Sequence, residues 1–256
     1  MAKSKQVAVP LYSVNAIVLR RISFSETDRI VTLYSRELGK ISGIAKGARK
    51  PISRLAGATE TLTHGRFQLA TGKNLDVITQ AEAKDSFPRI KEDMRKVACG
   101  IYVAELVERF VEEREPNVPL FELLLSTLYL LERPNDPEKI THMFELRFMS
   151  LMGYQPRLDK CVRCGADLSG DQVYFSPSLG GVICSHCGHL PEDATRTSLT
   201  TVHTMEALLT AQPPEVEKMQ ISTNVMEEIS RMMRWYIRFR APSEIKSMNF
   251  LHIASE

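Results

Sequence analysis

The segment Arg29-Ile-Val-Thr-Leu-Tyr-Ser35 and, after a Leu38-Gly39 turn, the segment Lys40-Ile-Ser-Gly-Ile-Ala-Lys46 show how the first third of the chain folds. In the first segment two sets of side chains alternate, and this period of two is typical of a β-strand with two distinct faces. Gly43, inside the second segment, predicts a bulge or a sharp bend of the kind found at a barrel corner.

Three further segments have the character of short strands, and they are residues 15–22, 66–70 and 75–81. The last two are joined by a predicted hairpin turn at residues 71–74. Five short strands within about 70 residues predict a small closed β-barrel. An OB-fold and an SH3-like barrel fit this count equally well.

From residue 89 onward the apolar residues recur at steps of three and four, which indicates helices. The pattern predicts one helix of about 25 residues that starts at 89 and ends before Pro116. Further helices are expected at 120–132, 137–152, 201–209 and 224–239. Pro137 suits a first helical turn, and Gly153 suits a helix end. Cys99 lies near an apolar helix face, so we expect a buried residue rather than a reactive thiol.

Four of the five cysteines form two C-x-x-C pairs, Cys161 with Cys164 and Cys184 with Cys187, each followed directly by glycine. Two residues between thiolates allow a tight turn to place both sulfurs about 2.3 Å from one zinc ion, and Gly165 and Gly188 are expected to adopt positive φ there. Four thiolates fill the coordination shell, so the predicted zinc is structural. A histidine, His186 or His189, in place of one thiolate is the alternative.

These observations predict an α+β protein of two domains. Residues 1–82 would form the five-stranded barrel, and residues 83–256 an α-helical domain. The zinc-binding part, at about residues 158–190, would be inserted in the helical domain, and we call it the cysteine module.

The overall composition is that of an ordinary globular protein, with 43% hydrophobic and 25% charged residues in 256. This excludes a disordered tail, a collagen-like rod and a disulfide-dense mini-protein. No stretch approaches the roughly 18 apolar residues of a membrane span, and the N-terminal residues do not resemble a signal peptide. We therefore expect a cytoplasmic protein with no membrane partner.

The net charge of +2 is an average over two unlike parts. Residues 1–80 contain 13 Lys and Arg against 5 Asp and Glu, a net charge of +8, while the remainder has a net charge of −6. No carboxylate lies between Glu37 and Glu60, a stretch that contains five of the cations. Such a cluster attracts a polyanion, and the alternative is a solvated basic loop without a partner.

No enzyme motif was found in the sequence. It contains neither a phosphate loop of the NTPase type nor G-x-S-x-G, and no histidine is followed by glutamate at the His-x-Glu offset of zinc deaminases. We therefore predict a protein that is not an enzyme.

Several segments together resemble the N-terminal motif of the RecO family of bacterial recombination mediators. They are Ser25-Glu-Thr-Asp-Arg-Ile-Val-Thr-Leu-Tyr34, Gly39-Lys40, Ala45-Lys-Gly-Ala-Arg-Lys50 and Ser53-Arg54. The order of a barrel, a helical region and inserted cysteine pairs also matches. The resemblance implies an OB-fold that binds single- and double-stranded DNA, anneals complementary strands and helps load recombinase onto gaps coated by single-strand-binding protein. It also implies RecR and the acidic, apolar C-terminal tail of the single-strand-binding protein as partners, and no use of ATP.

The resemblance places the DNA-contacting group in the motif segments, at Arg29, Lys40, Lys46, Arg49, Lys50 and Arg54. Charge and position alone add four weaker candidates, Arg20, Arg36, Arg66 and Lys73. For the protein tail, we point to basic residues on an apolar helix, Arg234 and Arg238. The first 80 residues hold only four aromatic residues, so phosphate contacts rather than base stacking should dominate.

Two other functions fit parts of the pattern. One is a zinc-stabilised adaptor whose basic barrel contacts structured RNA while the helical domain binds proteins. The other is a zinc-dependent nucleic-acid enzyme. Competition between DNA and structured RNA for binding would distinguish the adaptor from a recombination mediator. An assay of catalytic turnover after chelation of the metal would distinguish the enzyme.

Overall fold

The computed structural model describes residues 10–50 and 52–253 of the chain. Contacts divide it into two compact units. The barrel unit comprises Met1–Pro88 with Ala104–Phe121, and the helical unit comprises Arg89–Val103 with Glu122–Glu256. Helices α3 (Met94–Phe110) and α4 (Val118–Glu132) contribute residues to both units. The division between residues 82 and 83 stays a prediction.

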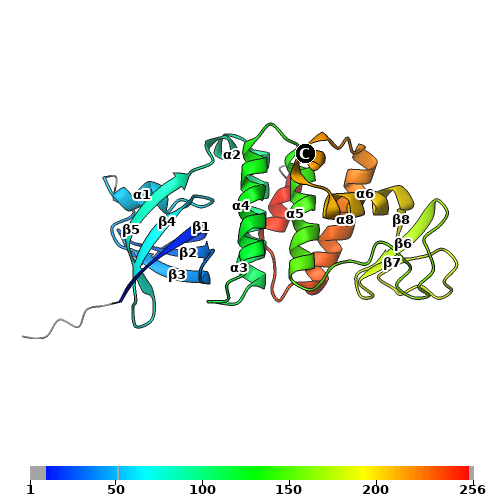
Figure 1. Ribbon diagram of the computed structural model, residues 1–256, viewed down its shortest axis with the longest axis horizontal. Helices are drawn as coiled ribbons and strands as arrows, with labels where there is room; N and C mark the ends of the chain where they lie inside the picture. The colour runs from blue at the N-terminus through cyan, green and yellow to red at the C-terminus, as the bar shows by residue number, and fades with distance from the viewer. Residues whose placement is uncertain (1–9, 51, 254–256) are drawn as a thin grey trace, which may run out of the picture. The chain divides into compact units, whose positions relative to one another are not determined.

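The barrel closes in the strand order β1-β2-β3-β5-β4 (Figure 1). Its strands are β1 (Leu11–Ser23), β2 (Arg29–Ser35), β3 (Gly39–Ala45), β4 (His64–Ala70) and β5 (Asp76–Asp85). Neighbouring strands are antiparallel except for β3 and β5, and the short helix α1 (Arg54–Ala58) stands between β3 and β4 in the chain. This arrangement is that of an OB-fold, which excludes the SH3-like alternative.

The barrel core consists of the inward-facing residues of all five strands. Its fully buried members include Val18, Val31, Leu33, Phe67 and Leu69. The register of β1 with β2 shifts between Val18 and Arg20, which marks a bulge. Residues 16–19 of β1 are all buried although their sequence alternates, because Ala16 and Val18 belong to the barrel core while Ile17 and Leu19 are buried outside that core.

The bulge expected at Gly43 is not present, because β3 pairs with β2 without a register shift. Gly43 pairs with Val31 of β2 and also with Asp76 of β5, where the barrel closes with parallel strands. A Cβ atom on Gly43 would lie 3.1 Å from Ile78 Cγ1 and 3.2 Å from Leu69 Cδ2. The glycine therefore permits a close approach of core side chains rather than an extra residue in the strand.

The single helix of about 25 residues predicted from residue 89 is wrong, because α2 (Pro88–Glu92) and α3 are separated at Asp93. The Asp93 carboxylate accepts hydrogen bonds from the backbone N–H of Arg95 at 2.9 Å and of Lys96 at 3.3 Å. These bonds cap the new helix, which explains why the chain restarts there. Helix α3 then ends at Phe110, before a loop in which Arg114 has a φ of 59°.

The helical unit contains the other predicted helices at or near their expected positions, as α4, α5 (Pro137–Leu151), α6 (Leu199–Thr210) and α8 (Thr223–Arg240). Pro137 occupies the first turn of α5, Gly153 has a φ of 81°, and Cys99 is buried as predicted. Helices α7 (Pro213–Lys218) and α9 (Ser247–Ile253) were not predicted.

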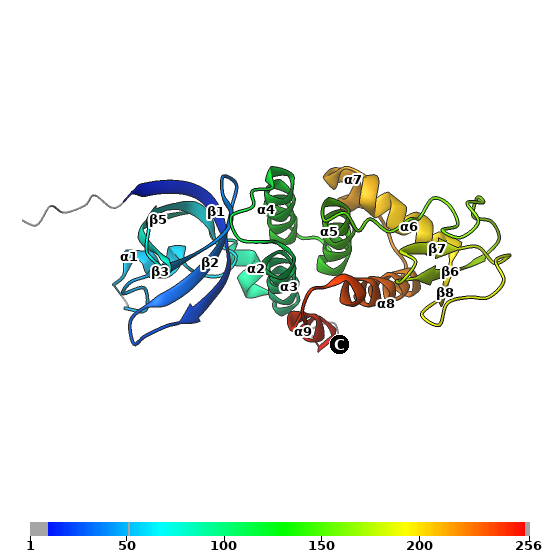
Figure 2. The same ribbon diagram turned by 90° about the horizontal axis from the view of Figure 1, so that it is seen from below.

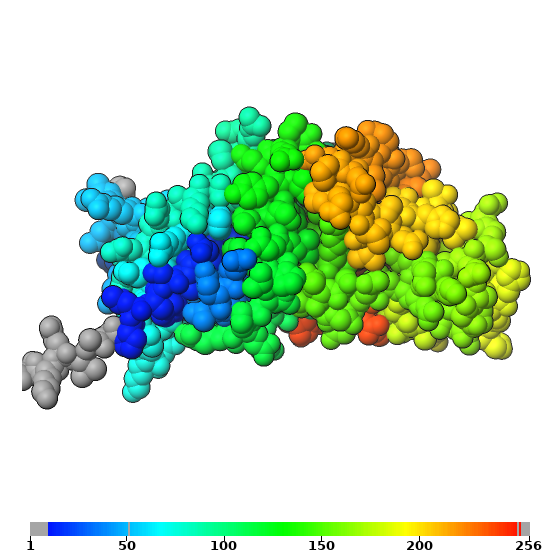
Figure 3. Space-filling model, in the orientation of Figure 1, coloured from blue at the N-terminus to red at the C-terminus, as the bar shows by residue number. Residues whose placement is uncertain are grey.

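A three-stranded sheet in the order β7-β6-β8 was not predicted either. Its strands are β6 (Gln172–Ser176), β7 (Gly181–Ile183) and β8 (Thr195–Ser198), and β8 leads directly into α6 (Figure 2). In the space-filling view the yellow residues of this region and the gold residues of α6 form one continuous surface (Figure 3). Among the described residues, no helix is both long enough and apolar enough to cross a membrane.

Candidate nucleic-acid interface and metal centre

Two loops of the barrel unit are tied together by the residues of the sequence motif. We call residues 24–28, between β1 and β2, and residues 46–50, after β3, the basic loop pair. The Asp28 carboxylate accepts a hydrogen bond from the backbone N–H of Gly47 at 2.9 Å. Arg49 donates through its backbone N–H to the Thr27 carbonyl at 2.9 Å and through Nη1 to the Ser25 carbonyl at 2.8 Å. The acidic motif residue therefore shapes the basic loop.

The ionised carboxylate of Asp28 is stabilised by its neighbours in the basic loop pair. Hydrogen bonds from the Gly47 N–H, the Thr27 hydroxyl and Ser25, with the nearby charge of Lys46, hold the pKa of Asp28 below its ordinary value. Gly47 has a φ of 65°, a conformation that glycine adopts without strain. At neutral pH an ionised carboxylate thus fixes a tight turn that presents cations.

The exposed cations of this region are Lys46, Arg49, Lys50 and Arg54. Of the four aromatic residues in the first 80, Tyr34 and Phe67 are buried in the barrel. Tyr12 donates its hydroxyl to the Asp76 carboxylate at 2.5 Å. Phe24, in the first loop of the pair, is 58% exposed. The interface is therefore rich in cations and has one exposed ring.

Three of the predicted contacts have other partners within the barrel unit. The Lys40 ammonium donates to the carbonyls of Glu108 at 2.8 Å and Val111 at 2.5 Å, so it caps the C-terminal end of α3. Arg29 pairs with Glu60 at 3.2 Å, and Arg20 pairs with Glu108 at 3.2 Å. These salt bridges partly neutralise both guanidinium groups.

The weaker candidates do not belong to the basic loop pair. Arg36 is exposed between β2 and β3, Arg66 is exposed on β4, and Lys73 is exposed in the hairpin turn before β5. The structure thus brings Lys46, Arg49 and Lys50 together on one loop and places the other predicted residues elsewhere on the barrel.

The four paired cysteines converge in the helical unit, where their sulfur atoms all lie within 4.8 Å of one another. The Sγ–Sγ distances are 3.6 Å for Cys161–Cys187 and 3.7 Å for both Cys164–Cys184 and Cys184–Cys187. A tetrahedron of sulfurs around zinc, each ~2.3 Å from the ion, has edges of about 3.8 Å. The cluster therefore fits a four-thiolate metal site.

The electrostatics of the cluster also suit a cation. Burial opposes ionisation of Cys161, but hydrogen bonds from the backbone N–H groups of Cys164, Cys184 and Arg163 lower its pKa to about 6. Interaction with the Cys161 sulfur and burial raise the pKa of Cys187 to about 12, because a second thiolate would be repelled. A divalent cation removes this repulsion and favours four thiolates.

The turns at the two cysteine pairs differ. Gly165 has the expected positive φ, of 73°, and donates its N–H to the Cys161 carbonyl at 3.0 Å. The same expectation is wrong for Gly188, which does not have positive φ, since the second turn closes through Cys187 N–H to the Cys184 carbonyl at 3.3 Å. Within the described residues the ligand cluster consists of cysteines, and neither His186 nor His189 joins it.

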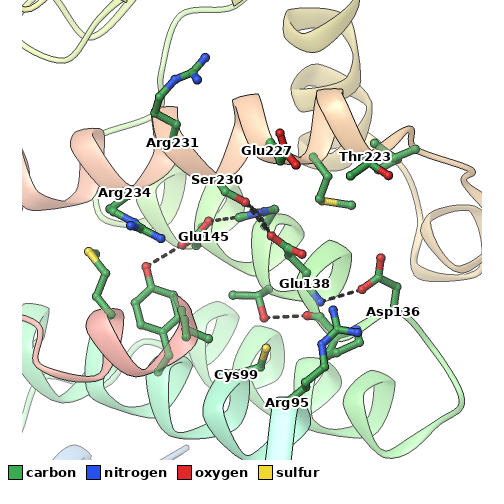
Figure 4. Close-up of a pocket in the computed structure, with 18 of the residues that line it drawn as sticks. Arg95, Cys99, Asp136, Glu138, Glu145, Thr223, Glu227, Ser230, Arg231 and Arg234 are labelled. Atoms are coloured by element: carbon green, nitrogen blue, oxygen red, sulfur yellow. Dashed lines mark hydrogen bonds and ion pairs between the residues drawn. The ribbon is translucent and has the colours of Figure 1, made fainter. Parts of the chain in front are cut away.

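A cavity of about 670 Å³ lies in the helical unit between α3, α5, α8 and α9 (Figure 4). A continuous chain of hydrogen bonds crosses it. The Tyr102 hydroxyl donates to Glu145 at 2.6 Å, and Glu145 contacts His142 Nδ1 at 2.6 Å. His142 Nε2 lies 2.8 Å from Ser230 Oγ, which donates to Glu138 at 2.7 Å.

This chain holds one imidazolium between two carboxylates. Burial alone would lower the pKa of His142, but the charges and hydrogen bonds of Glu145 and Glu138 raise it to about 9. The hydrogen bond to His142 correspondingly lowers the pKa of Glu138 to about 2. Ser230, His142 and Glu145 have the order of a hydrolase triad. A protonated histidine cannot accept the serine proton, so this arrangement stabilises the helices instead of activating a nucleophile.

The two basic residues suggested for a protein tail lie in different places. Arg234 lines the cavity, where it points toward Glu145 (Figure 4). Arg238 does not line the cavity and donates from Nη2 to the Asn249 side chain at 3.2 Å.

Comparison with known proteins accounts for both units. The family model "Recombination protein O N terminal" matches residues 9–87, and "Recombination protein O C terminal" matches residues 91–249. The chain belongs to the RecO family. It is 38% identical to the DNA repair protein RecO of Symbiobacterium thermophilum over 244 residues, which cover 94% of this chain and 96% of that protein. It is 37% identical to the DNA repair protein RecO of Pelotomaculum thermopropionicum over 241 residues, covering 94% and 93%. RecO proteins act in DNA repair and recombination.

Two features of this RecO protein were missed by reasoning from sequence. The basic loop depends on Asp28, which the motif contains but whose bond to Gly47 requires the fold. The cavity was missed because its polar residues come from α3, α5 and α8, which are far apart in the chain. Its one local signal is the spacing of Glu138, His142 and Glu145 along one helix face, at steps of four and three.

Proposed function

We propose that this RecO protein binds single- and double-stranded DNA through the basic loop pair, anneals complementary strands and helps load recombinase onto gaps coated by single-strand-binding protein. The observation that carries the proposal is the loop on which Lys46, Arg49 and Lys50 are exposed together. Asp28 holds that loop in place on an OB-fold. The family's role in DNA repair and recombination supports DNA as the polyanion.

Contacts to phosphate would dominate this interaction, because the interface has several cations and one exposed ring, Phe24. Lys46, Arg49, Lys50 and Arg54 are the contacts we propose first. Lys40, a helix cap, is left out of this group. Neutralised phosphates reduce the repulsion between two strands, while bases that are not stacked on protein stay free to pair. No step in this mechanism uses ATP or a catalytic residue.

We propose RecR and the C-terminal tail of the single-strand-binding protein as partners. The helical unit offers the tail a cavity in which apolar side chains, Met226 and Met248 among them, lie near cationic Arg95 and Arg234. An acidic, apolar peptide is complementary to this lining. Arg238 is outside the cavity and is no longer proposed for the tail. In this scheme the basic loop pair lies in the domain predicted at residues 1–82, and the site for the tail lies in the domain predicted at residues 83–256.

We propose one structural zinc ion, bound by Cys161, Cys164, Cys184 and Cys187. The ion would supply cross-linking, because four thiolates leave no open position for a substrate. Binding to such a site stabilises a fold that has little core of its own. We also propose that the protein works in the cytoplasm, associated with the nucleoid.

The test is annealing of complementary oligonucleotides coated with the cognate single-strand-binding protein. We compare wild type, the K46E/R49E/K50E variant and a matched triple reversal of exposed cations elsewhere, R89E/R196E/K218E. Loss of annealing in the first variant alone supports the proposal, and equal annealing by all three proteins contradicts it. Repeating the assay with a tail-deleted single-strand-binding protein tests the partner. If annealing of coated strands does not depend on the tail, the proposed docking is wrong.

A further inference from the structure

The outer face of α8 carries a second basic surface, which begins at the rim of the cavity and extends beyond it to residues that the proposed function does not use. Between Ile229 and Ser243 the chain has four arginines and no carboxylate, although residues 81–256 as a whole have a net charge of −6. Arg231, Trp235, Arg238 and Phe239 are exposed, and their spacing places them on one face of the helix. We call these four residues the α8 stripe.

The aromatic rings of the stripe are unusually accessible. Trp235 is 52% exposed and Phe239 is 55% exposed, while Met233 and Ile237 on the opposite face are buried and fix the helix in the unit. The Arg240 guanidinium lies 5.1 Å from the centre of the Phe239 ring. Arg240 also contacts the Tyr236 ring and donates to the Pro177 carbonyl at 3.2 Å. The Phe239 ring is therefore supported by a group that is itself anchored.

Alternating cations and exposed rings are the features that single-stranded nucleic acid requires. Arginines neutralise phosphates, and ring faces stack with unpaired bases whatever their sequence. A duplex offers phosphates but no free base faces. The acidic, apolar tail already has the cavity as its proposed site, and Arg238 and Phe239 lie outside that cavity. From Arg231 to Phe239 the stripe runs about 12 Å along the helix, so it can contact more than one nucleotide.

We propose that the α8 stripe is a second binding site for single-stranded nucleic acid. The proposal does not rest on DNA binding by the barrel, since the stripe lies in the helical unit and shares no residue with the basic loop pair. One chain with both sites would hold two strands at once, which is what pairing of complementary strands needs.

Trp235 is the only tryptophan in the chain, so its fluorescence reports on the stripe. The full-length K46E/R49E/K50E protein is titrated at low salt with an unlabelled oligothymidylate of 15 nucleotides, and the fluorescence of Trp235 is recorded. Quenching of Trp235 that saturates with added oligonucleotide is the expected result. Unchanged emission throughout the titration overturns the proposal. Because this variant lacks the loop cations, failure of the barrel proposal and failure of the stripe proposal give different outcomes.

Two residues of the stripe separate this site from the cavity. Arg231 and Trp235 also line the cavity, but Arg238 and Phe239 do not. Adding R238A/F239A should weaken the oligothymidylate-dependent quenching by about 5- to 100-fold, the effect of losing a stacked base. The matched change of one exposed ring and one exposed cation elsewhere in the helical unit, Y129A/R89A, should leave it unaltered. Equal affinity in both variants, or quenching by a synthetic copy of the acidic tail but not by oligothymidylate, overturns the assignment.

Discussion

The barrel and the cysteine module are stabilised by different means. The barrel closes on itself through backbone pairing of five strands around a continuous apolar core. The buried cluster around the cysteines is small and consists of Cys161, Ile183 and Cys184, two of which are metal-ligand candidates. Apolar burial can therefore hold the barrel together without help, whereas the cysteine-bearing turns of the module pack around few apolar residues and would depend on the metal.

This difference indicates which region can carry a rigid binding surface on its own. The basic loop pair is attached to the barrel and shaped by Asp28, so its cations should keep their positions when the module is disrupted. The four predictions below challenge or refine that contrast.

Removal of the metal should cause the largest loss of stability, and this loss should be confined to the cysteine module. Substituting Cys161→Ser, or chelating the ion, should abolish hydrogen-exchange protection in β6 and β7, because binding of structural zinc is worth ~10 kcal/mol or more of apparent folding energy. Protection in β1 and β2 should stay unchanged. Cys99→Ser is the control, since Cys99 lies outside the cluster and its loss should leave one zinc per chain. Persisting protection in β6 after chelation would contradict a structural metal.

Substitution of His142 should produce the next largest effect. His142→Ala leaves the buried carboxylate of Glu145 and the half-buried carboxylate of Glu138 without their cation, and breaking a buried ion pair typically costs about 3–5 kcal/mol. Urea unfolding followed at Trp235, in the same unit, should show the loss. The control is His203→Ala, a change of the same residue type on exposed helix surface in the same unit. A loss below 1 kcal/mol in His142→Ala would mean that the network contributes little.

The pH dependence of unfolding should follow from the same network. The folded-state pKa of His142 is raised from 6.5 to about 9, so its contribution is fully present below pH 6.5 and is lost as pH rises through 9. The free energy of unfolding of the helical unit should decrease by about 3 kcal/mol over this window. The His142→Ala protein should lack that component. Parallel pH profiles for the two proteins would contradict the assignment.

The smallest effect is expected for Asp28→Ala, which removes the acceptor of the Gly47 N–H. Without this hydrogen bond the loop should loosen, so DNA affinity should fall by roughly fivefold. The charge change by itself would make the loop more basic and increase affinity. A decrease in DNA affinity, measured by fluorescence anisotropy, therefore shows that Asp28 acts by positioning the loop and not through its charge. Glu26→Ala, with the same charge change in the same loop, is the control.

Much of the fold could be predicted because it follows local periodicity and motif spacing. The alternation at residues 29–35 located β2 to the residue, and Pro137 marked the start of α5. The four-cysteine cluster followed from two C-x-x-C pairs. The break at Asp93 could not be predicted from period alone, because the apolar residues on either side of the cap keep a helical spacing.

The candidate site was less accessible to sequence reasoning, because formal charge does not show what a cation contacts. Lys40 lies in the same motif as Lys46, yet its ammonium caps α3, about 70 positions further along the chain. The exposure of Phe24 and of the rings on α8 likewise depends on which surfaces the fold covers. Such pairings form across the tertiary structure, where a single sequence carries little signal.

The central claim is that the exposed cations of the basic loop pair neutralise DNA phosphates. Its most direct test is the salt dependence of single-stranded DNA affinity for wild type and for K46E/R49E/K50E. If about five phosphates are neutralised, log K should fall with log salt at a slope of roughly −3.5 in wild type, and at about −1.4 after three contacts are lost. Equal slopes for the two proteins would contradict the claim.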